Sequence, residues 1–277
     1  MTNRDVIDQR GVDQPASVQR VAGEGIVGLF RAELIKLLKR RTFYVLVLVL
    51  AVLTALLASI FFLLPRAIEE ADIPIITKPD AYIFGAQQVL GQTWFPIILS
   101  TMFLAGELAT SAWATALTRN ARRWQHLIAR LLTTTGASWL AMLAAIGGFG
   151  LVALFLAEGT GSLPAGEWWG IAWKALLVVF TWVALGMAAS AWLRAVGPAI
   201  GATLAFSFAE GILALWGGWR SISLSIHTSA LLGSLDFGGF GGILGEMPSF
   251  GKALIVVLGW CVAAIAAAFA GLHFRDA

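Results

Sequence analysis

Residues 42–64 read TFYVLVLVLAVLTALLASIFFLL, a run of 23 residues that carries no charge and ends at Pro65. An α-helix rises about 1.5 Å per residue, so roughly 20 apolar residues cross the hydrocarbon core of a bilayer. This stretch decides the fold class, because a helix that is apolar on every side has to be surrounded by lipid or by a large protein core. The sequence therefore predicts a chain that spans a membrane.

The composition of the whole chain supports this class. Of the 277 residues, 58% are hydrophobic and 13% are charged, and the mean hydropathy is +0.82. Soluble domains carry about one quarter charged residues, so these values exclude a soluble globule, a disordered chain and a collagen. The formal net charge is +3. The basic residues lie beside the apolar runs, which indicates membrane orientation and no binding of nucleic acid.

Apolar runs of spanning length recur along the chain. The predicted fold class is an all-α membrane protein with six transmembrane helices. The expected spans are 42–64, 94–113, 131–157, 168–190, 197–216 and 250–272. They leave a loop at 114–130 on one side of the membrane and a long loop at 217–249 on the other, where a Gly-rich composition suits short helices and turns.

The two ends of the chain are polar. Residues 1–25 are expected to form a flexible leader without the apolar core of a signal peptide, and residues 273–277 a short tail. Between leader and first span, residues 26–41 predict an amphipathic helix lying on the membrane face. Apolar residues recur there at helical spacing, while Glu33 and Lys36 fall mostly on the other side.

Lys and Arg are distributed unevenly between the two sets of loops. Fourteen of the 19 lie on the side of the N-terminus, and five lie on the other side: Arg66, Lys78, Lys174, Arg220 and Lys252. Positive residues are retained in the cytoplasm. We therefore expect an inner or plasma membrane protein with both termini in the cytoplasm.

Sequence motifs for catalysis are absent. The chain has no Walker-type, H-E-x-x-H or G-x-S-x-G segment, and Cys261 is its only cysteine. The three histidines, His126, His227 and His273, are scattered, which favours surface or structural roles over a metal site. We expect no catalytic residue, no metal and no cofactor bound by this chain.

The most informative polar segment follows the second span. It combines Arg119, Arg122 and Arg123 with the interfacial aromatic Trp124. Such a segment either presents fixed charges to a cytoplasmic partner or enforces topology and binds anionic lipid. Glu107 lies within the span just before it, where an ionised carboxylate costs at least about 2 to 3 kcal/mol unless it meets a helix N-terminus or a cation, for which Arg119, Arg123 and Arg130 are the candidates. Glu107 either braces this loop against the bundle or reaches out to headgroup water.

These residues resemble the permease subunits of type 2 ABC exporters. That family has a Glu near the cytoplasmic end of the second helix, a Leu-Thr-Arg-like stretch about ten residues on, a further Arg and a basic residue opening the third helix. The matching residues here are Glu107, Leu117, Thr118, Arg119, Arg123, Trp124 and Arg130. The family's opening helix is also similar to a segment of this chain. That segment is residues 30–37, FRAELIKL, followed by Lys39, Arg40 and Arg41.

The resemblance implies a function for the whole chain. It implies a non-catalytic permease that pairs with a second permease chain, identical or different, and with separate cytoplasmic ATPase subunits that bind ATP and Mg. The residues expected to couple to the ATPase are Glu33, Lys36, Glu107, Thr118, Arg119, Arg122, Arg123, Trp124 and Arg130. The apolar, Trp-bearing bundle favours export of a lipophilic or amphiphilic compound. The alternatives are an energy-independent channel, a proton-coupled carrier and a membrane scaffold.

The predicted fifth span carries two further features. Glu210 is an intramembrane acid that binds a cation, takes up a proton, pairs with an outer residue such as Arg220, or docks the outer loop. Small residues recur every four positions and allow close approach of another helix, either within the subunit or between two chains. These small residues are Gly197, Gly201, Ala205 and Ala209.

Overall fold

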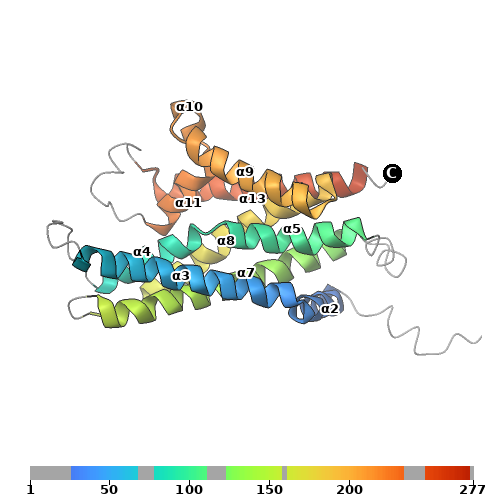
Figure 1. The fold of residues 1–277 in the computed structure, drawn as a ribbon. Coiled ribbons are helices and arrows are strands. Elements are labelled where there is room, and N and C mark those ends of the chain that lie inside the picture. The colour runs from blue at the N-terminus through green and yellow to red at the C-terminus, as the bar shows by residue number, and fades with distance from the viewer. Residues whose placement is uncertain (1–25, 68–77, 111–122, 158–160, 234–246, 275–277) are drawn as a thin grey trace, which may run out of the picture.

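The computed structural model describes residues 26–67, 78–110, 123–157, 161–233 and 247–274. All regular structure in these ranges is helical (Figure 1). The helices are α2 (Ile26–Lys39), α3 (Arg41–Ala67), α4 (Lys78–Leu90), α5 (Trp94–Ala109), α7 (Arg123–Leu156), α8 (Ala165–Leu193), α9 (Val196–Leu213), α10 (Gly217–Arg220), α11 (Leu224–Leu232) and α13 (Phe250–Phe274).

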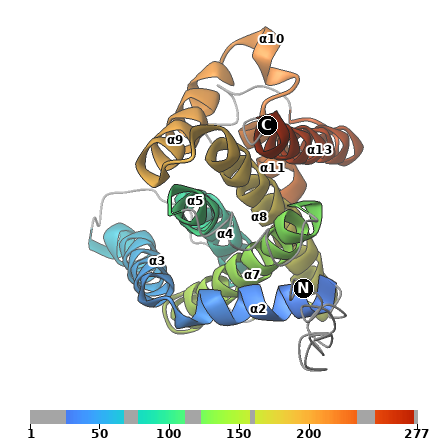
Figure 2. The same cartoon turned by 90° about the vertical axis from the view of Figure 1, so that its right-hand side faces the viewer.

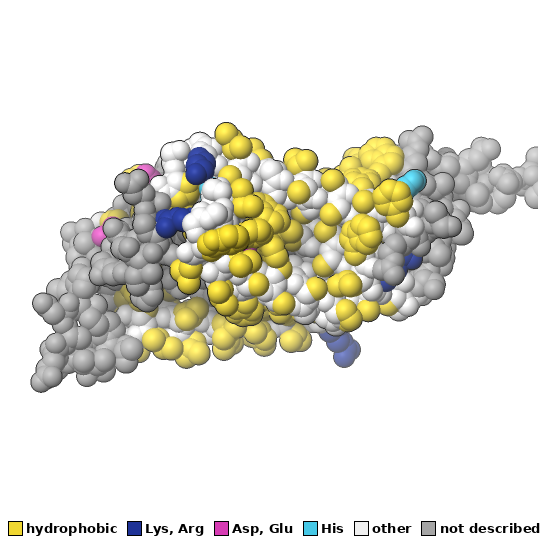
Figure 3. Space-filling model, turned by 90° about the horizontal axis from the view of Figure 1, so that it is seen from above, with side chains coloured by type: hydrophobic (Ala, Val, Ile, Leu, Met, Phe, Trp, Pro, Cys, Tyr) yellow, Lys and Arg dark blue, Asp and Glu magenta, His cyan; other side chains and the backbone are white. Residues whose placement is uncertain are grey.

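Six segments of the described chain are long and apolar enough to cross a membrane, which confirms the number of predicted spans. They correspond to α3, to α4 and α5 together, and to α7, α8, α9 and α13. Hydrophobic side chains cover most of the middle of the face drawn in Figure 3. The protein is therefore a multi-pass, all-helical membrane protein.

Helix α8 lies at the centre of the bundle. It packs against α5, α7, α9 and α13, and the end-on view in Figure 2 shows these helices around it. Small residues allow the closest approach: a Cβ added at Gly186 of α8 would lie 2.1 Å from Ser100 Oγ of α5. The centre of the bundle is thus closely packed, while α3 and α9 lie at its outside.

The second span differs from its predicted form. A buried helix, α4, precedes it and packs against α7, and residues 91–93 separate α4 from α5. Pro96 explains this break, because it has no N–H to donate to the carbonyl of Gln92 and its ring would clash with that carbonyl in a continuous helix. Helix α5 ends at Ala109, and residues 111–113 of the predicted span lie outside the described residues.

The third span also begins elsewhere than predicted. We expected a loop at 114–130, but residues 123–130 are the first turns of α7. The prediction was wrong because hydropathy marks the edge of the bilayer, whereas a helix can continue beyond it through polar residues such as Gln125 and His126. The remaining expected helices begin and end within a few residues of their predicted bounds.

Both described ends of the chain lie at the same end of the bundle. Helix α2, the end of α5, the start of α7 and the end of α13 are all on the right in Figure 1. Helices α10 and α11, from the predicted outer loop 217–249, lie toward the other end. This arrangement follows from an even number of spans, and it gathers α2, α5 and α7 where the candidate site is found.

Candidate functional site: an ion-pair cluster joining α2, α5 and α7

Helix α2 packs against the bundle through a face that carries both a charged and an apolar residue. Its buried residues are Glu33 and Leu37, one helical turn apart, while the apolar Phe30 and Leu38 are exposed. Glu33 thus lies on the side of α2 opposite most of its larger apolar residues, as predicted, but this side meets α7. Most of the larger apolar residues of α2, unlike Leu37, face away from the protein, as expected of a helix that lies on a membrane surface. The other face is left for contact with α7.

Arg130 of α7 binds both buried carboxylates of this region. Its Nη2 atom lies 3.2 Å from each carboxylate oxygen of Glu33 on α2 and 2.5 Å from Oε2 of Glu107 on α5. The Arg130, Glu33 and Glu107 side chains are only 1%, 3% and 8% exposed. The expected compensation of Glu107 by a nearby arginine is thus present, and Glu33 shares the same guanidinium.

Two further cations close the cluster from the solvent side. Lys36 Nζ lies 2.9 Å from Glu33 Oε1 and 3.6 Å from Glu107 Oε1. Arg40 Nη2 lies 3.6 Å from the same Glu107 oxygen, and Arg40 Nη1 donates to the Met102 carbonyl oxygen at 3.4 Å. Both cations remain partly exposed. We call these five residues, Glu33, Lys36, Arg40, Glu107 and Arg130, the ion-pair cluster.

An aromatic ring supports the cluster from within the bundle. The guanidinium carbons of Arg40 and Arg130 lie 4.8 and 5.3 Å from the ring centroid of the buried Phe103. A cation over an aromatic face gains about 0.5 to 2 kcal/mol, more when it is desolvated. Phe103 lies one turn before Glu107 on α5, so this helix supplies both a carboxylate and an aromatic face to the same two arginines.

The electrostatics of Glu33 reflect this arrangement. Burial by itself raises the pKa of Glu33, but the charge of Arg130 and the hydrogen bond and charge of Lys36, together with the hydrogen bond from Arg130, hold the pKa below its usual value of 4.5. Glu33 is therefore ionised at neutral pH and holds its cations as a carboxylate.

Mechanically, the cluster joins three parts of the chain. Arg40 lies between α2 and α3, Glu107 lies in the last turn of α5, and Arg130 lies in the first part of α7. Removing one partner of a buried ion pair costs about 3 to 5 kcal/mol, because it leaves an uncompensated charge. Displacement of any one of these helices from the others is accordingly opposed, and α2, α5 and α7 tend to move together.

Sequence reasoning assigned part of this site. Glu33, Lys36, Glu107 and Arg130 were all expected to serve the coupling function, and the structure brings them together. Arg40 was named as part of the segment that resembles the family's opening helix but was not among the expected coupling residues, and Phe103 was missed. The i, i+3, i+7 spacing of Glu33, Lys36 and Arg40, which places them along one helical face, could have pointed to Arg40.

The other expected coupling residues are not part of the cluster as described. Trp124 is exposed on the first turn of α7, and Arg123 begins that helix. The side chain of Arg123 and all of Thr118, Arg119 and Arg122 lie outside the described residues. These residues remain expectations from the sequence.

Glu210 docks the start of α11 onto α9, the fifth span. Its carboxylate is fully buried and accepts hydrogen bonds from the Ser223 hydroxyl at 2.6 Å and from the Ser225 backbone N–H at 3.0 Å. These donors lie at the N-terminal end of α11, where a negative charge is stabilised by the helix dipole. Of the alternatives open from the sequence, the loop-docking contact is the one that the geometry supports.

The stripe of small residues lies on the outer surface of the subunit. Its four members are exposed, and added Cβ atoms at its two glycines would meet open space. Among the described residues nothing packs against the two glycines, so packing within one subunit gains no support, and contact between two chains stays a prediction from the sequence. The stripe consists of Gly197, Gly201, Ala205 and Ala209.

Within the described ranges, no group of three or more His, Cys, Asp or Glu side chains is placed to hold a metal ion. In comparisons with known proteins, no family model and no curated protein matches this sequence.

Proposed function

We propose that this chain is the membrane-spanning permease subunit of an ATP-driven ABC exporter. In this proposal the chain lies in the cell membrane with both termini in the cytoplasm, pairs with a second permease chain, and is driven by separate ATPase subunits that bind ATP and Mg. Its own helices carry no catalytic residue. The cargo is a lipophilic or amphiphilic compound, in keeping with an apolar bundle that buries few unpaired charges.

The contact of Arg130 with both Glu33 and Glu107 is the observation that carries the proposal. It ties the surface helix α2 to the two helices that flank residues 111–122, where Thr118, Arg119 and Arg122 lie in the sequence. A soluble motor that pushes on this region would therefore move α2, α5 and α7 as a unit. Nucleotide changes the membrane part only as far as the motor prefers one of its conformations.

The polar and charged contacts also bear on the competing functions. A proton-coupled carrier would use Glu107 and Glu210 as acids that exchange protons with a pathway. Glu107 is instead surrounded by three cations, and Glu210 is buried against the start of α11. These contacts favour structural roles for both carboxylates and give the carrier hypothesis little support.

Purification of the tagged chain from its native cells tests the proposal. We expect an ATPase subunit to copurify, and the complex in liposomes to move a lipophilic cargo only when ATP is present. The variant Lys36→Gln should weaken the coupling of hydrolysis to transport, because it removes one of the two exposed cations of the cluster. Arg41→Gln, an exposed cation at the start of α3 for which no cluster contact is described, is the matched control.

The result that would contradict the proposal is a chain that purifies without any ATPase and conducts solute in liposomes without ATP. Uptake driven by a pH gradient alone, abolished by Glu210→Gln, would favour the carrier instead. Equal coupling in Lys36→Gln and Arg41→Gln would show that the cluster has no part in transmitting the motor's action.

A further inference from the structure

Helix α2 carries two sets of cations that differ in their surroundings. Lys36 and Arg40 contact Glu107 and belong to the ion-pair cluster. Arg31 and Lys39 are exposed, and among the described residues neither of them forms a hydrogen bond or an ion pair. These two cations are therefore available to a partner outside the described chain.

Exposed apolar side chains accompany the two cations. Arg31 and Lys39 lie eight residues apart with Ile35 between them, and this i, i+4, i+8 spacing places all three along one side of the helix. Val27 and Leu38 extend the same side. Val27, Ile35 and Leu38 are 75%, 48% and 44% exposed. We call Val27, Arg31, Ile35, Leu38 and Lys39 the outer face of α2.

The outer face of α2 points sideways from the bundle. Figure 2 shows α2 lying across the end of the bundle, along its edge and beside α7. Glu33, on the other side of α2, binds Arg130 of α7, and this contact decides which side of the helix faces inward. A helix held in this way lies along the membrane face, at the level where the spans leave the hydrocarbon core.

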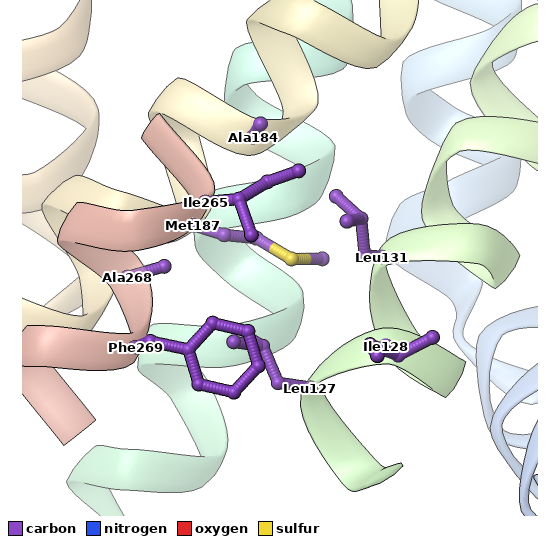
Figure 4. A pocket seen from close by; sticks show the side chains of 8 residues that line it. All are labelled: Leu127, Ile128, Leu131, Ala184, Met187, Ile265, Ala268 and Phe269. Atoms are coloured by element: carbon purple, nitrogen blue, oxygen red, sulfur yellow. The ribbon is translucent and has the colours of Figure 1, made fainter. Parts of the chain in front are cut away.

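An apolar cleft inside the bundle near this end is too small for a ligand. It lies between α7, α8 and α13, is lined only by apolar side chains, among them Leu127, Met187 and Phe269 (Figure 4), and has a volume of about 10 Å³. Such a volume holds at most about one water molecule. The outer face of α2, in contrast, is open and combines charge with apolar surface.

A phospholipid with an anionic headgroup matches both properties of the outer face. Its phosphate accepts charge-assisted hydrogen bonds from Arg and Lys, and its acyl chains surround apolar side chains at the boundary of the hydrocarbon core. Arg31 and Lys39 lie about 12 Å apart along the helix axis, so each binds a separate headgroup. Glu33 is the one acidic residue of α2 and lies on the buried side, so no carboxylate on the outer face repels a phosphate.

Other partners match the outer face less well. A zwitterionic phospholipid carries a cationic group beside its phosphate, so it gains less from Arg31 and Lys39. A soluble acidic protein would bind the two cations but would also have to cover Val27, Ile35 and Leu38, on a helix that faces sideways at the level of the membrane. The combination of cations with exposed apolar side chains therefore favours an anionic lipid.

We propose that the outer face of α2 binds the headgroups of anionic phospholipids. Arg31 and Lys39 each hold one phosphate, and the three apolar residues of the face insert among the acyl chains. Because Glu33 on the other side of the same helix binds Arg130, the bound lipids also hold the ion-pair cluster at the membrane face. This binding needs no ATP and no ATPase subunit, so it does not depend on the proposed transport function.

Site-specific quenching measures which lipids surround α2. A fluorophore is attached at Ala32→Cys, an exposed position of α2, in the full chain with Cys261→Ala, which removes the native thiol. Phosphatidylcholine nanodiscs then contain the same small fraction of either phosphatidylglycerol or phosphatidylcholine with a nitroxide near the top of one acyl chain. We expect about fivefold enrichment of phosphatidylglycerol beside the label, the fold-change that corresponds to about 1 kcal/mol per cation.

Variants and salt identify the source of this enrichment. Arg31→Gln together with Lys39→Gln removes both charges and should lower the enrichment to about onefold. Lys252→Gln, which removes an exposed cation at the start of α13, is the matched control and should leave the enrichment beside residue 32 unchanged. Raising the salt concentration to about 1 M, where the Debye length falls to about 3 Å, should weaken the enrichment in the unsubstituted face.

Three results would overturn the proposal. The first is equal quenching by the two lipids when Arg31 and Lys39 are both present. The second is an enrichment that survives the double substitution. The third is a double variant that loses a copurifying ATPase subunit but keeps the enrichment, since this result would assign the outer face to a soluble protein.

Discussion

Replacement of Arg130 by Met tests the central contact of the bundle. The substitution keeps an unbranched side chain in the same space but removes the charge that binds Glu33 and Glu107. Loss of one partner from a buried ion pair costs about 3 to 5 kcal/mol. Here Lys36 remains 2.9 Å from Glu33 and Arg40 remains 3.6 Å from Glu107, so part of the compensation is kept. We expect a loss near the lower end, about 3 kcal/mol of unfolding free energy.

The assay is equilibrium unfolding in mixed micelles, followed by tryptophan fluorescence, for which the chain offers 12 tryptophans. Arg41→Met, which replaces the exposed arginine at the start of α3, serves as the control and should change the unfolding free energy by less than about 0.5 kcal/mol. A second control removes the buried charges together. The triple variant Arg130→Met, Glu33→Gln and Glu107→Gln should recover most of the loss, because it leaves no uncompensated carboxylate.

Two results would refute this reasoning. If Arg130→Met costs less than about 1 kcal/mol, the short contacts of Arg130 contribute little net stability, as is found for exposed salt bridges. If the triple variant is as unstable as Arg130→Met, the loss comes from packing around the Arg130 side chain and not from its charge.

Three further predictions follow from other contacts. Because the pKa of Glu33 in the folded protein lies below its usual value, ionised Glu33 stabilises the fold above about pH 4.5, and this stabilisation is lost as the pH falls through the folded pKa. Glu33→Gln should remove this loss when the free energy of unfolding is measured from pH 7 to pH 3. The same pH dependence in Glu33→Gln and in the wild type would contradict this prediction. Gly186→Ala should cost about 1 to 3 kcal/mol in the same assay, since its Cβ would lie 2.1 Å from Ser100 Oγ, whereas Gly170→Ala, with open space around it, should be neutral. Gly201→Leu should leave the subunit folded but weaken association of two chains in size-exclusion chromatography, and an unchanged dimer would show that α9 is not at the contact.

The six spans were predictable because each depends on one local property, the length of an apolar run. The pairing of Glu107 with a nearby arginine was predictable for a related reason: an ionised carboxylate inside a span requires a cation, and Arg130 was one of few candidates. Both predictions rest on the cost of placing charge in hydrocarbon, which the sequence alone reveals.

The inward orientation of Glu33 was not predictable from its helix. An amphipathic pattern shows which residues share a face, but it does not show whether that face meets water or another charged helix. Here the buried face of α2 carries Glu33 because Arg130 lies opposite, and that pairing joins residues 97 positions apart in the chain. Helix α4 escaped prediction because its sequence, KPDAYIFGAQQVL, mixes charges and glutamines with apolar residues. Its burial depends on contact with α7.

The break at residues 91–93 has a consequence for how the bundle deforms. Helix α4 packs mainly on α7, while α5 packs mainly on α8, so the two halves of one span have different neighbours. A rotation of α7 against α8 would therefore change the angle between α4 and α5 at this joint and would not require either helix to bend. Pro96 thus gives the second span a built-in pivot at the depth of Thr54.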